Sequence, residues 1–114
     1  FWAARAAPTL PVFAQGGKTV GVLRTAAGDT ALQSGWAGPA SAVPRGTSGF
    51  DIVTRTHVEG HAAAVMRADG VTEATLYINN PAVCSSCATL LPRMLPPGSQ
   101  LTVVTPGGST TFIG

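Results

Sequence analysis

The second half of the chain alternates between helical and strand patterns, and this alternation most narrows the folds that it can adopt. Apolar residues at helical spacing follow Thr56 and stop at Gly70, and residues 73–78 have the composition of a strand. A second helix is expected over residues 84–95, and a strand over residues 100–104. Helices that alternate with strands cover a sheet, so the expected fold class is α/β.

The flanking segments add strands to this sheet. Residues 19–25 and 30–33 are expected to pair through a turn, and residues 110–113 are a candidate last strand. The predicted architecture is therefore a mixed sheet of about five strands flanked by helices. Residues 34–53 are rich in Gly and Pro and show no periodicity. A loop of this length in a small domain is usually functional.

Composition limits the class of protein. Hydrophobic residues make up 45% of the 114 residues and charged residues only 11%, which predicts one globular domain over residues 1–114. No apolar run reaches the roughly 18–20 residues of a membrane span, so no membrane partner is expected. The start of the chain has no signal-peptide pattern and no initiator Met, which favours a domain excised from a longer protein.

The charge balance permits a nucleic-acid partner without requiring one. The net charge is only +2, and the cations are six Arg residues and Lys18. Arg is favoured where a protein binds phosphates or base edges, and Arg55 and Arg93 are candidates for such contacts. The alternative is a chain that is simply rich in Arg.

Three residues form a candidate metal site. His57 stands at the start of the first predicted helix, and Cys84 and Cys87 stand at the start of the second. One His and two Cys supply three zinc ligands and leave a fourth position for water, as in a catalytic zinc site. Helix N-termini also favour thiolates over thiols. The alternative for the C-x-x-C pair is a redox motif.

Glu59 follows His57 in an H-x-E pattern, and a proline precedes the cysteine pair. Zinc-dependent nucleobase deaminases carry H-x-E followed by P-C-x-x-C, with the Glu as proton carrier beside the metal. Here two residues separate Pro81 from Cys84. The structural alternative for Glu59 is a capping box with Thr56 as the N-cap residue.

His61 is a second histidine in the same helix. The pattern His57-Val-Glu-Gly-His61 differs from the H-E-x-x-H of zinc proteases, because the Glu is one position late. We expect His61 on the helix surface or in a pocket wall. A non-enzymatic alternative, a small zinc-stabilised binding module, would use His61 as the fourth ligand and would not need Glu59.

Longer segments carry a family resemblance. Residues 56–67, 79–81 and 95–104, together with 16–21 and 34–35, resemble the bacterial toxin cytosine deaminases of the DddA-like family. The resemblance implies a cytidine-deaminase-like α/β/α sandwich and one Zn²⁺. It also implies the C-terminal toxin domain of a longer protein, which is delivered by secretion into the cytoplasm of a target cell and blocked by a cognate immunity protein. We expect the domain to be a monomer.

The same resemblance implies residue roles. It assigns His57, Cys84 and Cys87 as zinc ligands and Glu59 as the proton shuttle. The predicted substrate-binding residues are Val58, through its backbone, and Asn79, Asn80, Ser34 and Trp36. For either asparagine alone, turn formation before Pro81 is an equal alternative.

The predicted reaction is hydrolytic deamination of cytosine to uracil in DNA. Few cations, and no bulky side chain at Ser85 or Ser86 to replace a flipped base, favour single-stranded DNA. Trp36 is the best candidate for stacking, with Trp2 and Phe50 as others. Double-stranded DNA and free nucleosides remain alternative substrates.

Overall fold

The computed structural model describes residues 6–14 and 16–114, so Trp2 lies outside the described residues. Every expected strand and helix is present, with small shifts at the ends. The elements are β1 (Val20–Thr25), β2 (Gly28–Gln33), η2 (Pro39–Ala42), η3 (Thr54–Thr56), α1 (Val58–Asp69), β3 (Glu73–Ile78), α2 (Ser85–Met94), β4 (Gln100–Thr105) and β5 (Gly108–Ile113). The two η elements are short 3-10 helices in and after the predicted loop.

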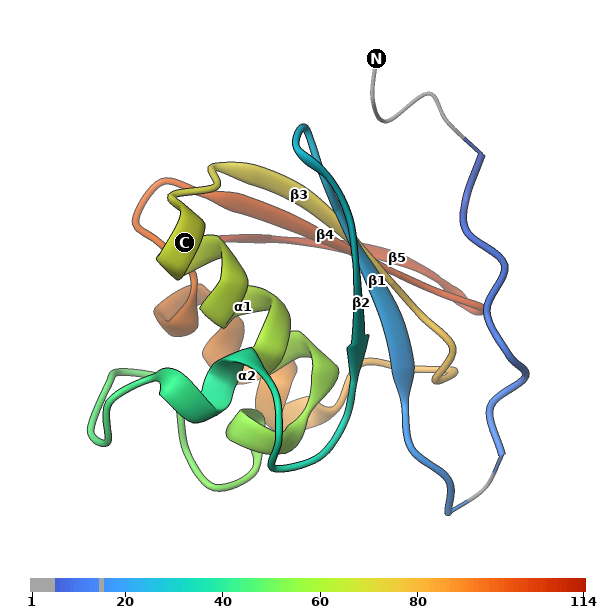
Figure 1. Cartoon of the computed structure of the whole chain (residues 1–114), viewed down its shortest axis with the longest axis horizontal. Helices are drawn as coiled ribbons and strands as arrows, with labels where there is room; N and C mark the ends of the chain where they lie inside the picture. The colour runs from blue at the N-terminus through green and yellow to red at the C-terminus, as the bar shows by residue number, and fades with distance from the viewer. Residues whose placement is uncertain (1–5, 15) are drawn as a thin grey trace.

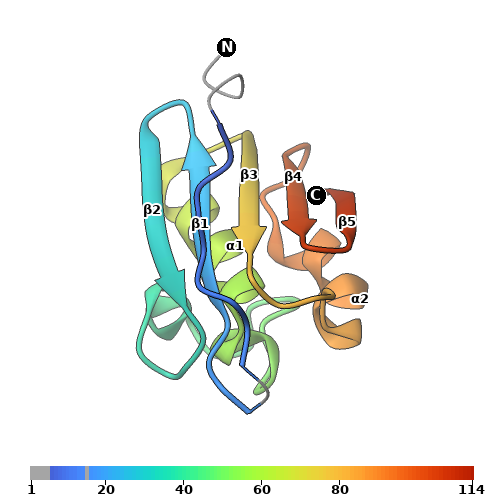
Figure 2. The ribbon, with the colours of Figure 1, turned by 90° about the vertical axis from the view of Figure 1, so that its right-hand side faces the viewer.

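The five strands form one mixed sheet, which confirms the predicted α/β class. The strand order is β2-β1-β3-β4-β5, with β3 parallel to β4 and the other pairs antiparallel. Both α-helices cover the same face of the sheet (Figure 1). In the described chain, the opposite face is crossed by the extended N-terminal segment rather than by a helix (Figure 2).

The core lies between the sheet and the helices. In β3, Ala74, Leu76 and Ile78 are buried and alternate with more exposed residues, as a half-covered strand requires. These side chains belong to one apolar cluster with residues of both helices. Its fully buried members include Leu23, Val58, Ala62, Met66, Leu76, Leu91, Met94, Leu101 and Val103.

Polar side chains anchor the N-terminal segment to the opposite face. The Arg24 guanidinium donates to the carbonyl oxygen of Ala6 at 2.9 Å and forms an ion pair with Asp29 at 3.0 Å. It also lies 5.3 Å from the centre of the Tyr77 ring. Arg24 is therefore a structural cation of this face.

Helix α1 begins one residue later than predicted. Its N-cap is His57, in an extended conformation and without a side-chain cap hydrogen bond. The predicted capping box of Thr56 and Glu59 is wrong, because the Thr56 hydroxyl donates backward to the carbonyl of Val53 at 2.9 Å. The expected stop at Gly70 is confirmed, since Gly70 is the C-cap with a left-handed φ of 67°.

The topology brings the starts of both helices to one place. Both α1, which leads into β3, and α2, which joins parallel strands β3 and β4, run antiparallel to β3. Their N-termini therefore meet beyond the carboxyl end of β3. Two glycines permit the close packing of α1: a Cβ at Gly21 would lie 2.7 Å from Cγ1 of Val58, and one at Gly60 would overlap the carbonyl oxygen of Thr54.

Candidate metal centre and active site

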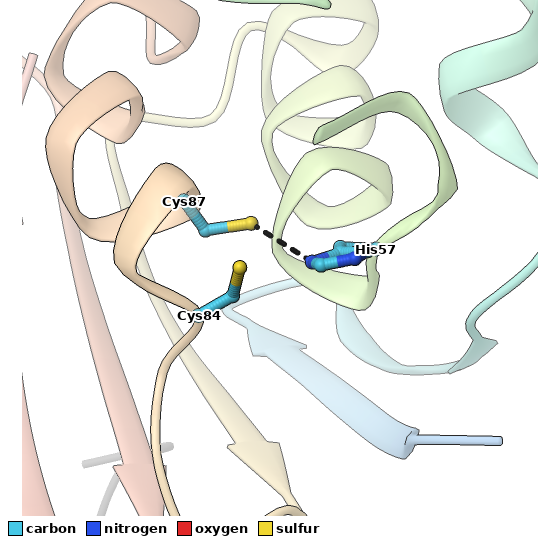
Figure 3. A group of neighbouring side chains, drawn as sticks. All are labelled: His57, Cys84 and Cys87. Atoms are coloured by element: carbon cyan, nitrogen blue, oxygen red, sulfur yellow. Dashed lines mark hydrogen bonds between the residues drawn. The ribbon is translucent and has the colours of Figure 1, made fainter. Parts of the chain in front are cut away.

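The three predicted ligands converge where the two helices begin. His57 is the N-cap of α1, Cys84 is the N-cap of α2, and Cys87 lies in the first turn of α2. Their ligand atoms all lie within 4.8 Å of one another, and Nδ1 of His57 is 3.4 Å from Sγ of Cys87. The imidazole and both sulfurs point toward one common position (Figure 3).

This donor set fits a zinc ion. Zn–S bonds of about 2.3 Å and a Zn–N bond of about 2.0 Å in a tetrahedron separate the ligand atoms by roughly 3.5–3.8 Å. The observed spacing needs only a small contraction to reach these values. Both cysteines are free, so no disulfide competes for the thiols. His57 and Cys84 are half-buried and Cys87 is buried, which leaves one side of the group open.

Cys87 shows why a cation suits this position. Burial, and then the negative charge of Glu59, raise the pKa of the Cys87 thiol far above its ordinary value. Burial therefore outweighs the helix N-terminus, which was expected to favour the thiolate. A divalent cation at this position would compensate the charge of a thiolate, so metal binding would release a proton and would weaken in acid.

Glu59 lies in the first turn of α1, beside the ligand group. Its side chain is only 4% exposed, and burial raises the pKa of its carboxyl group. The Glu59 and Cys84 backbone N–H groups and the nearby His57 oppose this shift. A buried carboxyl group whose pKa is raised toward neutrality can both accept and return a proton.

A cavity of about 750 Å³ opens onto this group. Its wall includes His57, Glu59 and Cys84, which places the metal position and the carboxylate at one surface. Lys18 supplies the only cationic side chain in the wall as the structure describes it. The cavity is larger than one pyrimidine ring needs and lies within the usual size range of ligand sites.

Four of the five predicted substrate-binding residues line this cavity, namely Val58, Asn80, Ser34 and Trp36. Val58 is fully buried, and Trp36 is 65% exposed. The Ser34 hydroxyl accepts from the backbone N–H of Thr19 at 3.0 Å, and the Asn80 amide donates to the Thr19 hydroxyl at 3.2 Å. The two side chains thus form one hydrogen-bonded wall through Thr19.

Asn79 is the exception, because the structure places it outside the cavity. Its Oδ1 accepts from the backbone N–H of Val20 at 2.9 Å, and its Nδ2 donates to the carbonyl of Pro11 at 3.0 Å. Both ends of the amide therefore hold β1 and the N-terminal segment together.

Several wall residues were not predicted from the sequence. Lys18 and Thr19 precede β1, Val83 precedes the cysteine pair, and Phe13 and Ile52 come from irregular segments. The Gly16-Gly-Lys-Thr segment carries part of the family resemblance, and this resemblance is the sequence signal for Lys18 and Thr19. Phe13 and Ile52 carry no motif.

His61 is a buried structural residue, so its expected place on the helix surface or in a pocket wall is wrong. Its Nδ1 accepts from the backbone N–H of Ala40 at 3.1 Å, and its Nε2 lies 3.0 Å from the carbonyl oxygen of Gly35. The first bond requires an unprotonated Nδ1, so Nε2 carries the proton and donates. Burial lowers the pKa of His61, which agrees with a neutral ring. Both nitrogens are occupied, which removes His61 as a fourth zinc ligand.

Replacing His61 tests this role. His61→Ala leaves the buried N–H of Ala40 and carbonyl of Gly35 without partners, so we expect the free energy of unfolding to fall by about 2–5 kcal/mol. Urea unfolding measures this loss. Folded His61→Ala is expected to bind as much zinc as the wild type, whereas loss of zinc from folded protein would show that His61 is a ligand.

The fold and the site together define a class of protein. A mixed sheet with His at the start of one helix, Cys-x-x-Cys at the start of the next and a buried Glu beside them is the arrangement of nucleobase deaminases. The sequence model of the SCP1.201-like deaminase family matches residues 3–114. The chain therefore belongs to the SCP1.201-like deaminase family.

One relative is similar over part of the chain. It is the double-stranded DNA deaminase toxin A of Burkholderia cenocepacia (strain H111), which is 39% identical over 54 residues. The similar region is 46% of this chain and 4% of the relative. The family match and this similarity confirm the expected resemblance to the DddA-like toxin deaminases. No helix in the described parts of the chain is long and apolar enough to cross a membrane.

Proposed function

We propose that this domain is a zinc-dependent DNA deaminase that converts cytosine to uracil. The observation that carries the proposal is the convergence of His57, Cys84 and Cys87 to within 4.8 Å, at a cavity whose wall also contains Glu59. Zinc, when bound, lowers the pKa of a coordinated water to about 7. The DNA substrate is supported by the name of the relative, which includes DNA deamination.

The residues of the chain then divide the work. Water adds to C4 of cytosine and the amino group leaves as ammonia. Both protons of the water must therefore move: one goes to N3, where it stays in uracil, and the other goes to the leaving amino group as the oxygen becomes the C4 carbonyl. We assign the transfer of these protons to Glu59, because its buried side chain lines the same cavity wall as the ligands His57 and Cys84. Val58, Ser34 and Asn80 line the cavity and are proposed to bind the base.

We propose that single-stranded DNA is the preferred substrate. The exposed residue of the Cys-x-x-Cys segment is Ser85, which is too small to fill the gap that a flipped base leaves in a duplex. Lys18 is the only cation of the described cavity wall, so the wall offers little electrostatic attraction for the phosphates of two DNA strands. Exposed Trp36 offers a stacking surface for an unpaired base.

Matched oligonucleotides test the substrate. A labelled strand with one cytosine, alone or in a duplex, is incubated with the protein and then cleaved at uracil. We expect cleavage of the single strand to be about 10- to 10³-fold faster, since a duplex adds the few kcal/mol needed to unpair and unstack the base. An equal or faster duplex reaction would contradict the preference, and activity on deoxycytidine alone would indicate a nucleoside deaminase.

The biological setting is also a proposal. We propose that residues 1–114 form a single monomeric toxin domain of a longer protein, delivered by secretion into the cytoplasm of target cells and inhibited by a cognate immunity protein. The support is the word toxin in the name of the relative, of which the similar segment covers 4%.

A further inference from the structure

A second cavity of about 490 Å³ adjoins the catalytic cavity. The two share Trp36 and Ile52 in their walls, so these side chains form a ridge between them. Both ridge residues are highly exposed for apolar side chains, Trp36 at 65% and Ile52 at 71%. Exposed apolar side chains often mark a binding site, and these two would contact a ligand that extends from one cavity into the other.

The chemistry of the second cavity differs from that of the first. Val43 and Phe50 give it an apolar wall, and Phe50 is nearly buried, so its place is set by the core. Arg45 and Arg55 both line it as well. A hollow with aromatic and cationic walls suits a nucleobase that carries a phosphate.

The two arginines present their charge in different ways. Arg55 is held in place, since its guanidinium donates to the carbonyls of Ala40 at 3.2 Å and Pro44 at 2.9 Å. Arg45 is exposed. Neither arginine forms an ion pair within residues 6–14 and 16–114. The carboxylate in the same wall, Asp51, accepts from the backbone N–H groups of Val53 and Thr54, so its charge is directed into the loop.

We propose that this second cavity binds the nucleotide next to the target cytosine. The base of that nucleotide lies in the hollow beside Trp36 and Phe50, and its phosphate lies at Arg45. The inference rests on the proposed function and adds to it a site for the flanking nucleotide. With the cytosine in the catalytic cavity and its neighbour in the second cavity, two consecutive nucleotides are held on opposite sides of the ridge. This contact positions the cytosine next to Glu59.

Oligonucleotides with an abasic residue on the 5′ or the 3′ side of the cytosine test this site. In the wild type, removal of the flanking base on one side should lower kcat/KM by about 5- to 150-fold, the range that stacking of one base supplies. Ser41→Trp fills the cavity from its wall and should abolish this dependence on the flanking base. Ala42→Trp is the matched control, because Ala42 is the exposed neighbour in η2 and does not line the cavity.

Arg45 tests the phosphate contact separately. Arg45→Ala should raise KM and lower the salt dependence of binding by about one phosphate contact. Arg45→Lys is the matched control, because it keeps the positive charge at this position and should leave the salt dependence of binding close to the wild-type value. An unchanged rate on both abasic strands, or equal behaviour of the two Trp variants, would overturn the second site while deamination itself persists. If no cytosine strand is deaminated at all, the proposed function fails instead.

Discussion

Glu59→Gln is expected to lower kcat for cytosine deamination by about 10²–10⁴-fold, the range typical of general acid–base residues. The amide keeps the size of the side chain and its ability to accept from the Cys84 backbone N–H, but it cannot take up a proton from water. Single-turnover assays on a single-stranded oligonucleotide measure the loss directly, because substrate binding is then separated from chemistry.

Folding of this variant provides the control. Burial raises the pKa of Glu59 in the folded protein above its value in the unfolded chain. The free energy of unfolding therefore falls as the pH rises through the pKa of the folded state, and an uncharged Gln removes this loss. The Gln variant should therefore unfold at the same or a higher urea concentration at neutral pH, with its zinc content unchanged. Near-normal deamination by this folded variant would show that Glu59 is not the proton carrier.

Cys87→Ala should abolish both zinc binding and deamination. Two remaining ligands, His57 and Cys84, hold zinc far more weakly than three, and the metal position then lacks its most buried ligand. Elemental analysis should fall from about one zinc per chain to near zero, and uracil formation should fall with it. Ser86→Ala changes the neighbouring half-buried residue and should leave both values at the wild-type level.

A full complement of zinc in Cys87→Ala would contradict the ligand set. Retained activity without zinc would contradict a metal-dependent reaction altogether. A disulfide between Cys84 and Cys87 in active wild-type protein would favour the redox alternative.

The candidate site could be predicted from the sequence because its residues lie at the starts of helices. His57 and Cys84 are both N-caps, and the alternation of helices and strands brings such positions together beyond one strand end. The same regularity explains why the strand and helix ranges shifted by so few residues. The local sequence patterns and the order of the elements both predicted that the helix starts meet at one end of the sheet.

The roles of residues that contact the irregular loop could not be predicted from the sequence. His61 was misplaced because its partners, Gly35 and Ala40, lie in the segment without periodicity. Asn79 and Asn80 follow one strand, and successive side chains there point to opposite sides, so only one of the two reaches the cavity. The sequence identified the pair but not which member faces inward.

Hydrolytic deamination of cytosine with Glu59 as the proton carrier is tested most directly by following oxygen from water into the product. The protein with its zinc is incubated with a single-stranded oligonucleotide that contains one cytosine, in water labelled with heavy oxygen, and the strand is analysed by mass spectrometry. We expect the wild type, but not Glu59→Gln, to convert that cytosine to uracil with one labelled oxygen from water and to release ammonia. An unchanged strand, or uracil formed equally by both proteins, would contradict this mechanism.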